Sequence, residues 1–83
     1  MTDIAIIGRI GAFIKNERLN SNKTQAQLSD EAGVNRSTLS QIENGEAITL
    51  LSLIQIIRAL NKLELLEIFS IQQLISPDRK SVV

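Results

Sequence analysis

Residues 24–45 read TQAQLSDEAGVNRSTLSQIENG, and they contain the signals of two short helices separated by a tight turn. Thr24 followed three residues later by Gln27 is a capping box, in which each side chain bonds the backbone N–H of the other residue. A helix is therefore predicted to begin at this point. Gly33 predicts its end, because glycine adopts a positive φ at a helix C-terminus at little steric cost.

A second helix is predicted directly after this turn. Asn35 offers its side-chain oxygen to the first backbone N–H groups, so the helix begins at Arg36. It ends at Asn44 or Gly45, because both residue types favour helix termination. The intervening turn is then about three residues long, as a helix-turn-helix requires.

The two helices share a predicted core and leave one polar face outside. Apolar residues recur at helical spacing and turn toward a common interior, and these are Leu28, Ala32, Val34, Leu39 and Ile42. Ser29 is small enough to let the two helices approach closely. The second helix keeps on its outer side an almost acid-free set of polar residues, namely Arg36, Ser37, Ser40, Gln41 and Asn44.

With these residues the sequence resembles the phage repressor and Cro type of helix-turn-helix domain, known as the XRE family. The pattern lies at residues 24–25, 28, 32–34, 36–39, 42–43 and 45, followed by an apolar helix that ends at residues 59–60. The resemblance covers roughly residues 7–66. It implies an all-α, five-helix lambda-repressor-like DNA-binding domain that contains the helix-turn-helix.

The resemblance also assigns the residues that read DNA bases. In such domains the N-terminal part of the second motif helix contacts base edges in the major groove of double-stranded DNA. The predicted base-reading residues are Arg36, Ser37 and Gln41, with Asn35 and Ser40 added as neighbours. The side-chain chemistry agrees, since arginine pairs bidentately with guanine and glutamine with adenine.

Further roles follow from the same resemblance. Gln25 corresponds to a residue that holds a DNA phosphate, and additional phosphate contacts are predicted for Lys23, Thr24 and Asn44. Arg18 and Glu43 are predicted to form a structural ion pair between the first helix of the domain and the second helix of the motif. Breaking one side of such a partly buried pair is costly.

The composition limits the size and chemistry of the protein. Its 83 residues allow a single domain, which gains stability by forming a dimer. Without cysteine or histidine, the chain has no disulfide and no thiolate or imidazole metal site. We expect no cofactor, no small-molecule ligand and a cytoplasmic location without membrane contact, because no apolar run reaches the roughly 18 residues of a membrane span and no signal peptide is visible.

The net charge is zero, because nine basic side chains balance nine acidic ones. DNA-binding domains are often strongly basic, since phosphate neutralisation supplies most of their non-specific affinity. Lys23 and Arg36 nevertheless lie beside the two predicted helix starts. We therefore expect weak non-specific DNA binding and a strong dependence on a paired site.

A first helix is predicted over residues 3–19. Its apolar residues recur at helical spacing, at Ile7, Ile10, Phe13 and Ile14. Gly8 and Gly11 lie inside this helix, where each glycine costs up to ~1 kcal/mol relative to alanine. Two explanations stay open for them, a close helix contact or a frayed start.

The connections around the motif are also predicted. Asn22 lies in the polar loop before the motif, and asparagine tolerates the left-handed backbone conformation. After the motif, Thr49 is the expected N-cap of a helix over residues 50–60. The predicted core stripe of that helix is Leu50, Leu53, Ile57 and Leu60.

Residues 63–75 are apolar nearly all the way around a helical wheel, which is unusual for a surface helix of a monomer. We favour a fifth helix that packs on a second subunit over a short helix through about residue 69 and a strand that pairs across a dimer. The domain then covers residues 1–76, with a dimerisation segment at about 63–76 and a flexible tail at 77–83. The predicted dimerisation residues are Leu65, Ile68, Phe69, Ile71, Leu74 and Ile75.

The sequence thus predicts a sequence-specific DNA-binding regulator, a homodimeric repressor of a palindromic operator, since no segment that would recruit polymerase is visible. The alternative is a HipB-like antitoxin, which binds a protein toxin and autoregulates its operon. The residues that decide between the two are Ile68, Ile71, Leu74 and Ile75. If they stay exposed in the dimer a protein partner is implied, and if the second subunit buries them a plain repressor suffices. An enzyme is not expected, because the chain has no histidine or cysteine for catalysis and no glycine-rich phosphate loop.

Overall fold

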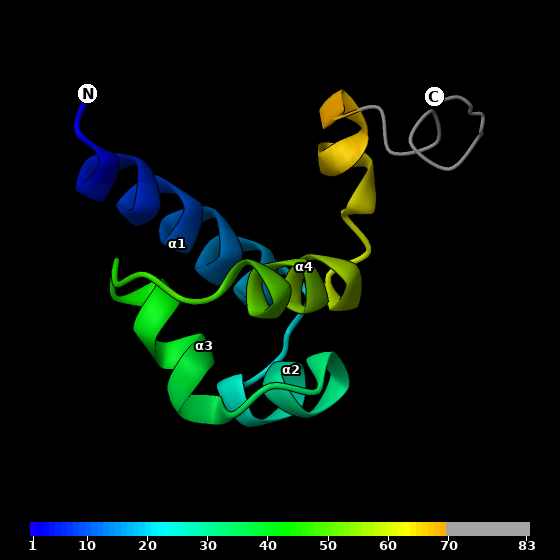
Figure 1. Cartoon of the computed structure of the whole chain (residues 1–83). Coiled ribbons are helices and arrows are strands. Elements are labelled where there is room, and N and C mark those ends of the chain that lie inside the picture. The colour runs from blue at the N-terminus through cyan, green and yellow to red at the C-terminus, as the bar shows by residue number, and fades with distance from the viewer. Residues whose placement is uncertain (70–83) are drawn as a thin grey trace.

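The computed structural model describes residues 1–69, which form five helical elements and no strand in that range (Figure 1). The elements are α1 (Asp3–Asn20), α2 (Gln25–Ala32), α3 (Arg36–Glu43), α4 (Leu50–Ala59) and the 3₁₀-helix η1 (Leu63–Phe69). The predicted all-α, five-helix fold is confirmed. The helix favoured over residues 70–76 and the tail at 77–83 lie outside the described residues.

The caps of α2 confirm where this helix begins and ends. The Thr24 side chain accepts from the Gln27 N–H while the Gln27 side chain accepts from the Thr24 N–H, so both halves of the capping box are present. Gly33 has a φ of 75°, which glycine adopts without strain, and its N–H closes the last turn of α2. Asn22 is left-handed as predicted, with a φ of 59°.

The predicted cap at the start of α3 is wrong in one respect. Asn35 has the extended backbone of an N-cap residue, but its side chain makes no capping hydrogen bond. Only its carbonyl serves the helix, by accepting from the N–H groups of Thr38 and Leu39. Asn35 is exposed, so water can satisfy the first N–H groups of α3 in place of its side-chain oxygen.

The core lies where the four α-helices meet. Each helix contributes one completely buried side chain, and these are Ile14, Leu28, Leu39 and Ile56. Figure 1 shows α2 and α3 next to each other, with α1 against α3, and the contacts between elements agree with this arrangement. The core therefore fixes the motif helices against a scaffold of α1 and α4.

The core stripe predicted for α4 is partly wrong. Leu50 is 70% exposed, whereas Ile56, which the prediction omitted, is completely buried beside Ile57 and Leu60. Seven of the residues between positions 50 and 60 are large and aliphatic, so more than one stripe fits the helical period. The packing of α4 against α2 determines which of these stripes is buried, and the sequence pattern alone does not determine it.

Of the two explanations considered for the glycines of α1, the close helix contact applies to Gly11. A Cβ atom built on Gly11 would lie 1.8 Å from the carbonyl oxygen of Ile42, so α1 and α3 touch backbone to backbone at this point. Gly8 would meet no atom within 4 Å. Only Gly11 is therefore required for the close approach of these two helices.

Candidate nucleic-acid interface

The exposed side of α3 collects the residues predicted to read DNA bases. Leu39 and Ile42 bury the opposite side of the helix in the core, which fixes the rotation of α3. The polar residues then face outward, and they are Asn35, Arg36, Ser37 and Gln41, all exposed, and Ser40, half-buried. The fold therefore presents amide, hydroxyl and guanidinium groups together on one helix face.

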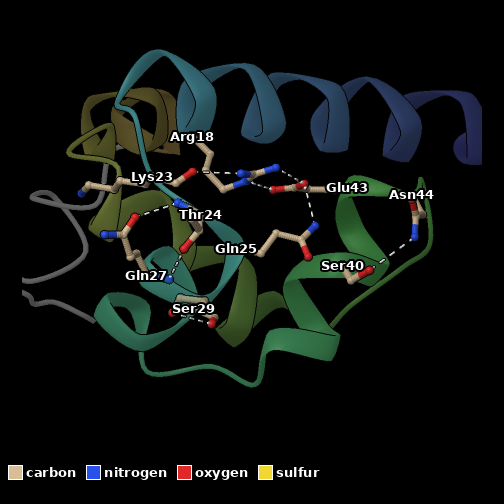
Figure 2. Close-up of polar contacts among 10 residues, drawn as sticks. Arg18, Lys23, Thr24, Gln25, Gln27, Ser29, Ser40, Glu43 and Asn44 are labelled. Atoms are coloured by element: carbon tan, nitrogen blue, oxygen red, sulfur yellow. Dashed lines mark hydrogen bonds and ion pairs between the residues drawn. The ribbon is translucent and has the colours of Figure 1, made fainter.

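Asn44 extends this polar face at the end of α3. Its Nδ2 donates to the Ser40 Oγ at 3.4 Å, one helical turn earlier (Figure 2). Both groups lie at the surface, since Asn44 is exposed and Ser40 half-buried. A phosphate contact by the Asn44 amide would use the donor hydrogen that this long bond leaves free.

The structure brings Arg18 and Glu43 together as a bidentate ion pair between α1 and α3. The Arg18 Nε lies 2.7 Å from the Glu43 Oε2, and the Nη2 lies 3.0 Å from Oε1. The two side chains are only 10% and 3% exposed. The third Arg18 donor, Nη1, bonds the carbonyl oxygen of Lys23 at 2.9 Å and so fixes the loop that precedes α2.

Gln25 joins this pair from the first turn of α2. Its Nε2 donates to the Glu43 Oε1 at 3.0 Å, so one carboxylate oxygen accepts from both Arg18 and Gln25 (Figure 2). Sequence reasoning missed this contact, because the two residues are 18 positions apart and no local pattern connects them. Gln25, the residue of α2 predicted to contact a phosphate, is therefore connected through Glu43 to α3 and through Arg18 to α1.

The electrostatics of the network keep Glu43 ionised. Burial acts to raise the pKa of the Glu43 carboxyl, but the hydrogen bonds from Arg18 and Gln25 and the charges of Arg18 and Lys15 outweigh it, so the pKa is lowered. The hydrogen bond to Glu43 raises the pKa of Arg18 against the opposing effect of burial. The pair is thus a carboxylate and a guanidinium at neutral pH.

The other predicted phosphate contacts also have partners inside the chain. Lys23 Nζ lies 2.6 Å from the Glu31 Oε1, and the Thr24 hydroxyl accepts the capping hydrogen bond of α2. Between residues 24 and 57 the only basic side chain is Arg36, against Asp30, Glu31, Glu43 and Glu46. The surface around the motif therefore carries little positive charge to attract phosphates without regard to sequence.

None of the helices within residues 1–69 is long and apolar enough to cross a membrane. The same residues contain no group of three or more carboxylates suited to a metal ion.

Comparison with known proteins gives the family. A model of the helix-turn-helix family matches residues 14–68, which is more than half of the chain and includes α2, α3 and α4 in full. A comparison with curated proteins found none that matches. The family is a DNA-binding, regulatory one and does not typically contain enzymes. This chain, with its capped α2, its glycine turn and its polar α3, belongs to the XRE-type helix-turn-helix family of DNA-binding transcriptional regulators.

Proposed function

We propose that the protein is a homodimeric repressor that acts in the cytoplasm and reads a near-palindromic operator. The observation that carries the proposal is the exposed polar face of α3, held outward by the burial of Leu39 and Ile42. A helix of this kind fits the major groove, and a two-fold dimer places two such helices ~34 Å apart, one turn of DNA. Occupation of the operator then blocks access of polymerase to a promoter that overlaps it.

Selection of bound duplexes from a random pool tests this function directly. The selected duplex and a scrambled control are then compared by fluorescence anisotropy at two salt concentrations. We expect a two-fold symmetric site bound at least ~10³-fold more tightly than scrambled DNA. Failure of folded protein to enrich any sequence would contradict the proposal.

The recognition residues are tested by Arg36→Ala and Gln41→Ala. Each change removes a side chain that can pair bidentately with a base from an exposed position, so specific binding should weaken by ~1–3 kcal/mol while the stability of the fold stays the same. Anisotropy titration with the selected site measures the loss. Arg58→Ala serves as the matched control, because Arg58 is exposed in the last turn of α4 and not on α3. Equal affinity of all three variants would disprove the assignment.

Gln25→Ala tests the phosphate contact of α2. Loss of one hydrogen bond to the DNA backbone should weaken binding to selected and scrambled duplexes alike, by ~1 kcal/mol or about fivefold. Gln55→Ala is the control, because Gln55 lies on α4 outside the motif and its loss should leave DNA binding unchanged. A loss confined to the selected site would instead show that Gln25 contributes to sequence reading.

An antitoxin is the second candidate function, and exposed apolar surface at the C-terminal end of the described chain favours it. Ile68 is 84% and Phe69 67% exposed within a single chain. Of the residues predicted to decide between the two functions, Ile71, Leu74 and Ile75 lie outside the described residues. An antitoxin predicts that Ile68 stays accessible in the dimer, and a plain repressor predicts that the second subunit covers it.

A further inference from the structure

An apolar groove of about 400 Å³ lies between α1, α4 and η1, on residues that the DNA interface does not use. Its lining includes Ile10, Phe13, Leu50, Leu53, Leu66 and Phe69. Leu50 and Phe69 are 70% and 67% exposed, so nothing within residues 1–69 closes the groove. Figure 1 shows η1 standing apart from α1, with α4 beneath both. An open apolar groove of this size on an 83-residue chain indicates a docking surface.

The same chain carries an apolar projection that does not belong to the groove. Ile68 is 84% exposed and is not among the residues that line the groove, although Leu65, Leu66 and Phe69 of the same η1 form one of its walls. Although these wall residues and Ile68 belong to the same short helix, Ile68 lies in water and not in the groove of its own chain. The described residues thus contain an open apolar groove and an exposed apolar side chain, Ile68, that does not fill it.

The sequence after Phe69 continues with apolar residues. Residues 70–77 read SIQQLISP and contain no charged side chain. Ile71 and Ile75 follow Ile68 at spacings of three and seven residues, and Leu74 lies beside them, which matches one face of a helix. Phe69, the residue that precedes this segment in the sequence, is one of the residues that line the groove.

We propose that the groove receives Ile68 and residues 71–75 of a second copy of this chain, and that the second copy receives the same residues in return. Two-fold symmetry makes such an exchange self-complementary, so both grooves are filled and no apolar projection is left over. Docking of residues 71–75 in their own groove would leave Ile68 in water, which is why the second copy is the better occupant. This inference rests on the homodimer of the proposed function and assigns the surfaces that form it.

Ile68→Asp tests the projection without disturbing the fold of one chain, since Ile68 is almost fully exposed there. Loss of a buried aliphatic side chain and burial of a carboxylate should raise the dimer dissociation constant about 100-fold or more. Sedimentation equilibrium measures this constant. Leu19→Asp is the matched control, because Leu19 is 52% exposed on α1 and does not line the groove. A monomeric wild type, or equal dimerisation of both variants, would overturn the proposal.

Cross-linking identifies which chain fills the groove. The chain has no cysteine, so Leu50→Cys in the groove and Leu74→Cys in the segment each introduce a single thiol. An isotopically labelled Leu50→Cys protein is mixed with an unlabelled Leu74→Cys protein and oxidised, and we expect a mixed disulfide dimer by mass spectrometry. Asp30→Cys in place of Leu50→Cys should give none. In the double variant Leu50→Cys/Leu74→Cys, a disulfide within one chain at low concentration would overturn the exchange.

These measurements separate the inference from the proposed function. A mixed disulfide dimer that enriches no DNA sequence would refute the repressor and leave the groove assignment standing. Binding to a symmetric DNA site by a dimer that forms no mixed disulfide would support the repressor and refute the groove assignment. Binding of a different protein to the groove of the intact dimer would also refute it, since the proposed exchange leaves no groove open.

Discussion

Gly11→Ala is expected to lower the free energy of unfolding by about 3 kcal/mol or more, and to leave little folded protein at moderate temperature. The added methyl group would lie 1.8 Å from the Ile42 carbonyl oxygen and 2.9 Å from its carbon. Both atoms belong to the backbone of α3, so no side-chain rotation relieves the overlap. Either α1 or α3 must move, and such a movement disturbs the core around Ile14 and Leu39. Urea unfolding followed by circular dichroism measures the loss.

Gly8→Ala is the matched control, one helical turn earlier on the same helix. No atom lies within 4 Å of the position that its Cβ would occupy. Alanine in a helix is favoured over glycine by about 0.5–1 kcal/mol, so this variant should be as stable as the wild type or slightly more stable. The two substitutions are chemically identical and should act in opposite directions. A destabilisation of equal size in both would mean that helix entropy, and not the contact with α3, sets the cost.

The local signals in the sequence were sufficient to predict the helix-turn-helix. Thr24, Gln27 and Gly33 act through hydrogen bonds and dihedral angles within a few residues, so their pattern identifies the ends of α2 directly. Gly8 and Gly11 could not be told apart, because the requirement for a glycine comes from the backbone of α3, 31 positions away at Ile42. Likewise, only the packing of α4 on α2 reveals that Ile56 is buried and Leu50 is not.

The candidate site divides in the same way. The polar face of α3 follows from the helical period once Leu39 and Ile42 are assigned to the core, so its residues could be predicted from the sequence. The contact between Gln25 and Glu43 depends on how three helices pack, and no spacing within α2 or α3 encodes it. The resemblance to the XRE family suggested the pairing of Arg18 with Glu43 and a phosphate contact for Gln25, but not the contact between Gln25 and Glu43.

Arg18→Met is expected to reduce the free energy of unfolding by about 3–5 kcal/mol, because it leaves a buried carboxylate without its cation. The Glu43 side chain is 3% exposed and would lose two hydrogen bonds, keeping only the one from Gln25. The double variant Arg18→Met/Glu43→Met removes both charges and should recover most of the loss. Lys62→Met breaks the more exposed pair with Glu17, 3.7 Å apart, and should cost less than about 1 kcal/mol. Urea unfolding of the four proteins at pH 7 measures these differences.

The dependence on pH gives an independent check of the same ion pair. The pKa of Glu43 is lowered in the folded protein, so its ionised form contributes stability above the unfolded-state value of about 4.3, and this contribution is lost as the pH falls through the folded-state pKa. Without Arg18, burial becomes the dominant influence and raises the pKa of Glu43. Protonation of Glu43 as the pH falls then removes the unpaired buried charge, so the variant loses less stability relative to the wild type. The stability difference between wild type and Arg18→Met should therefore shrink between pH 7 and pH 4. A difference that stays constant over this range would mean that Arg18 stabilises the fold through packing and its bond to the Lys23 carbonyl, and not through the charge of Glu43.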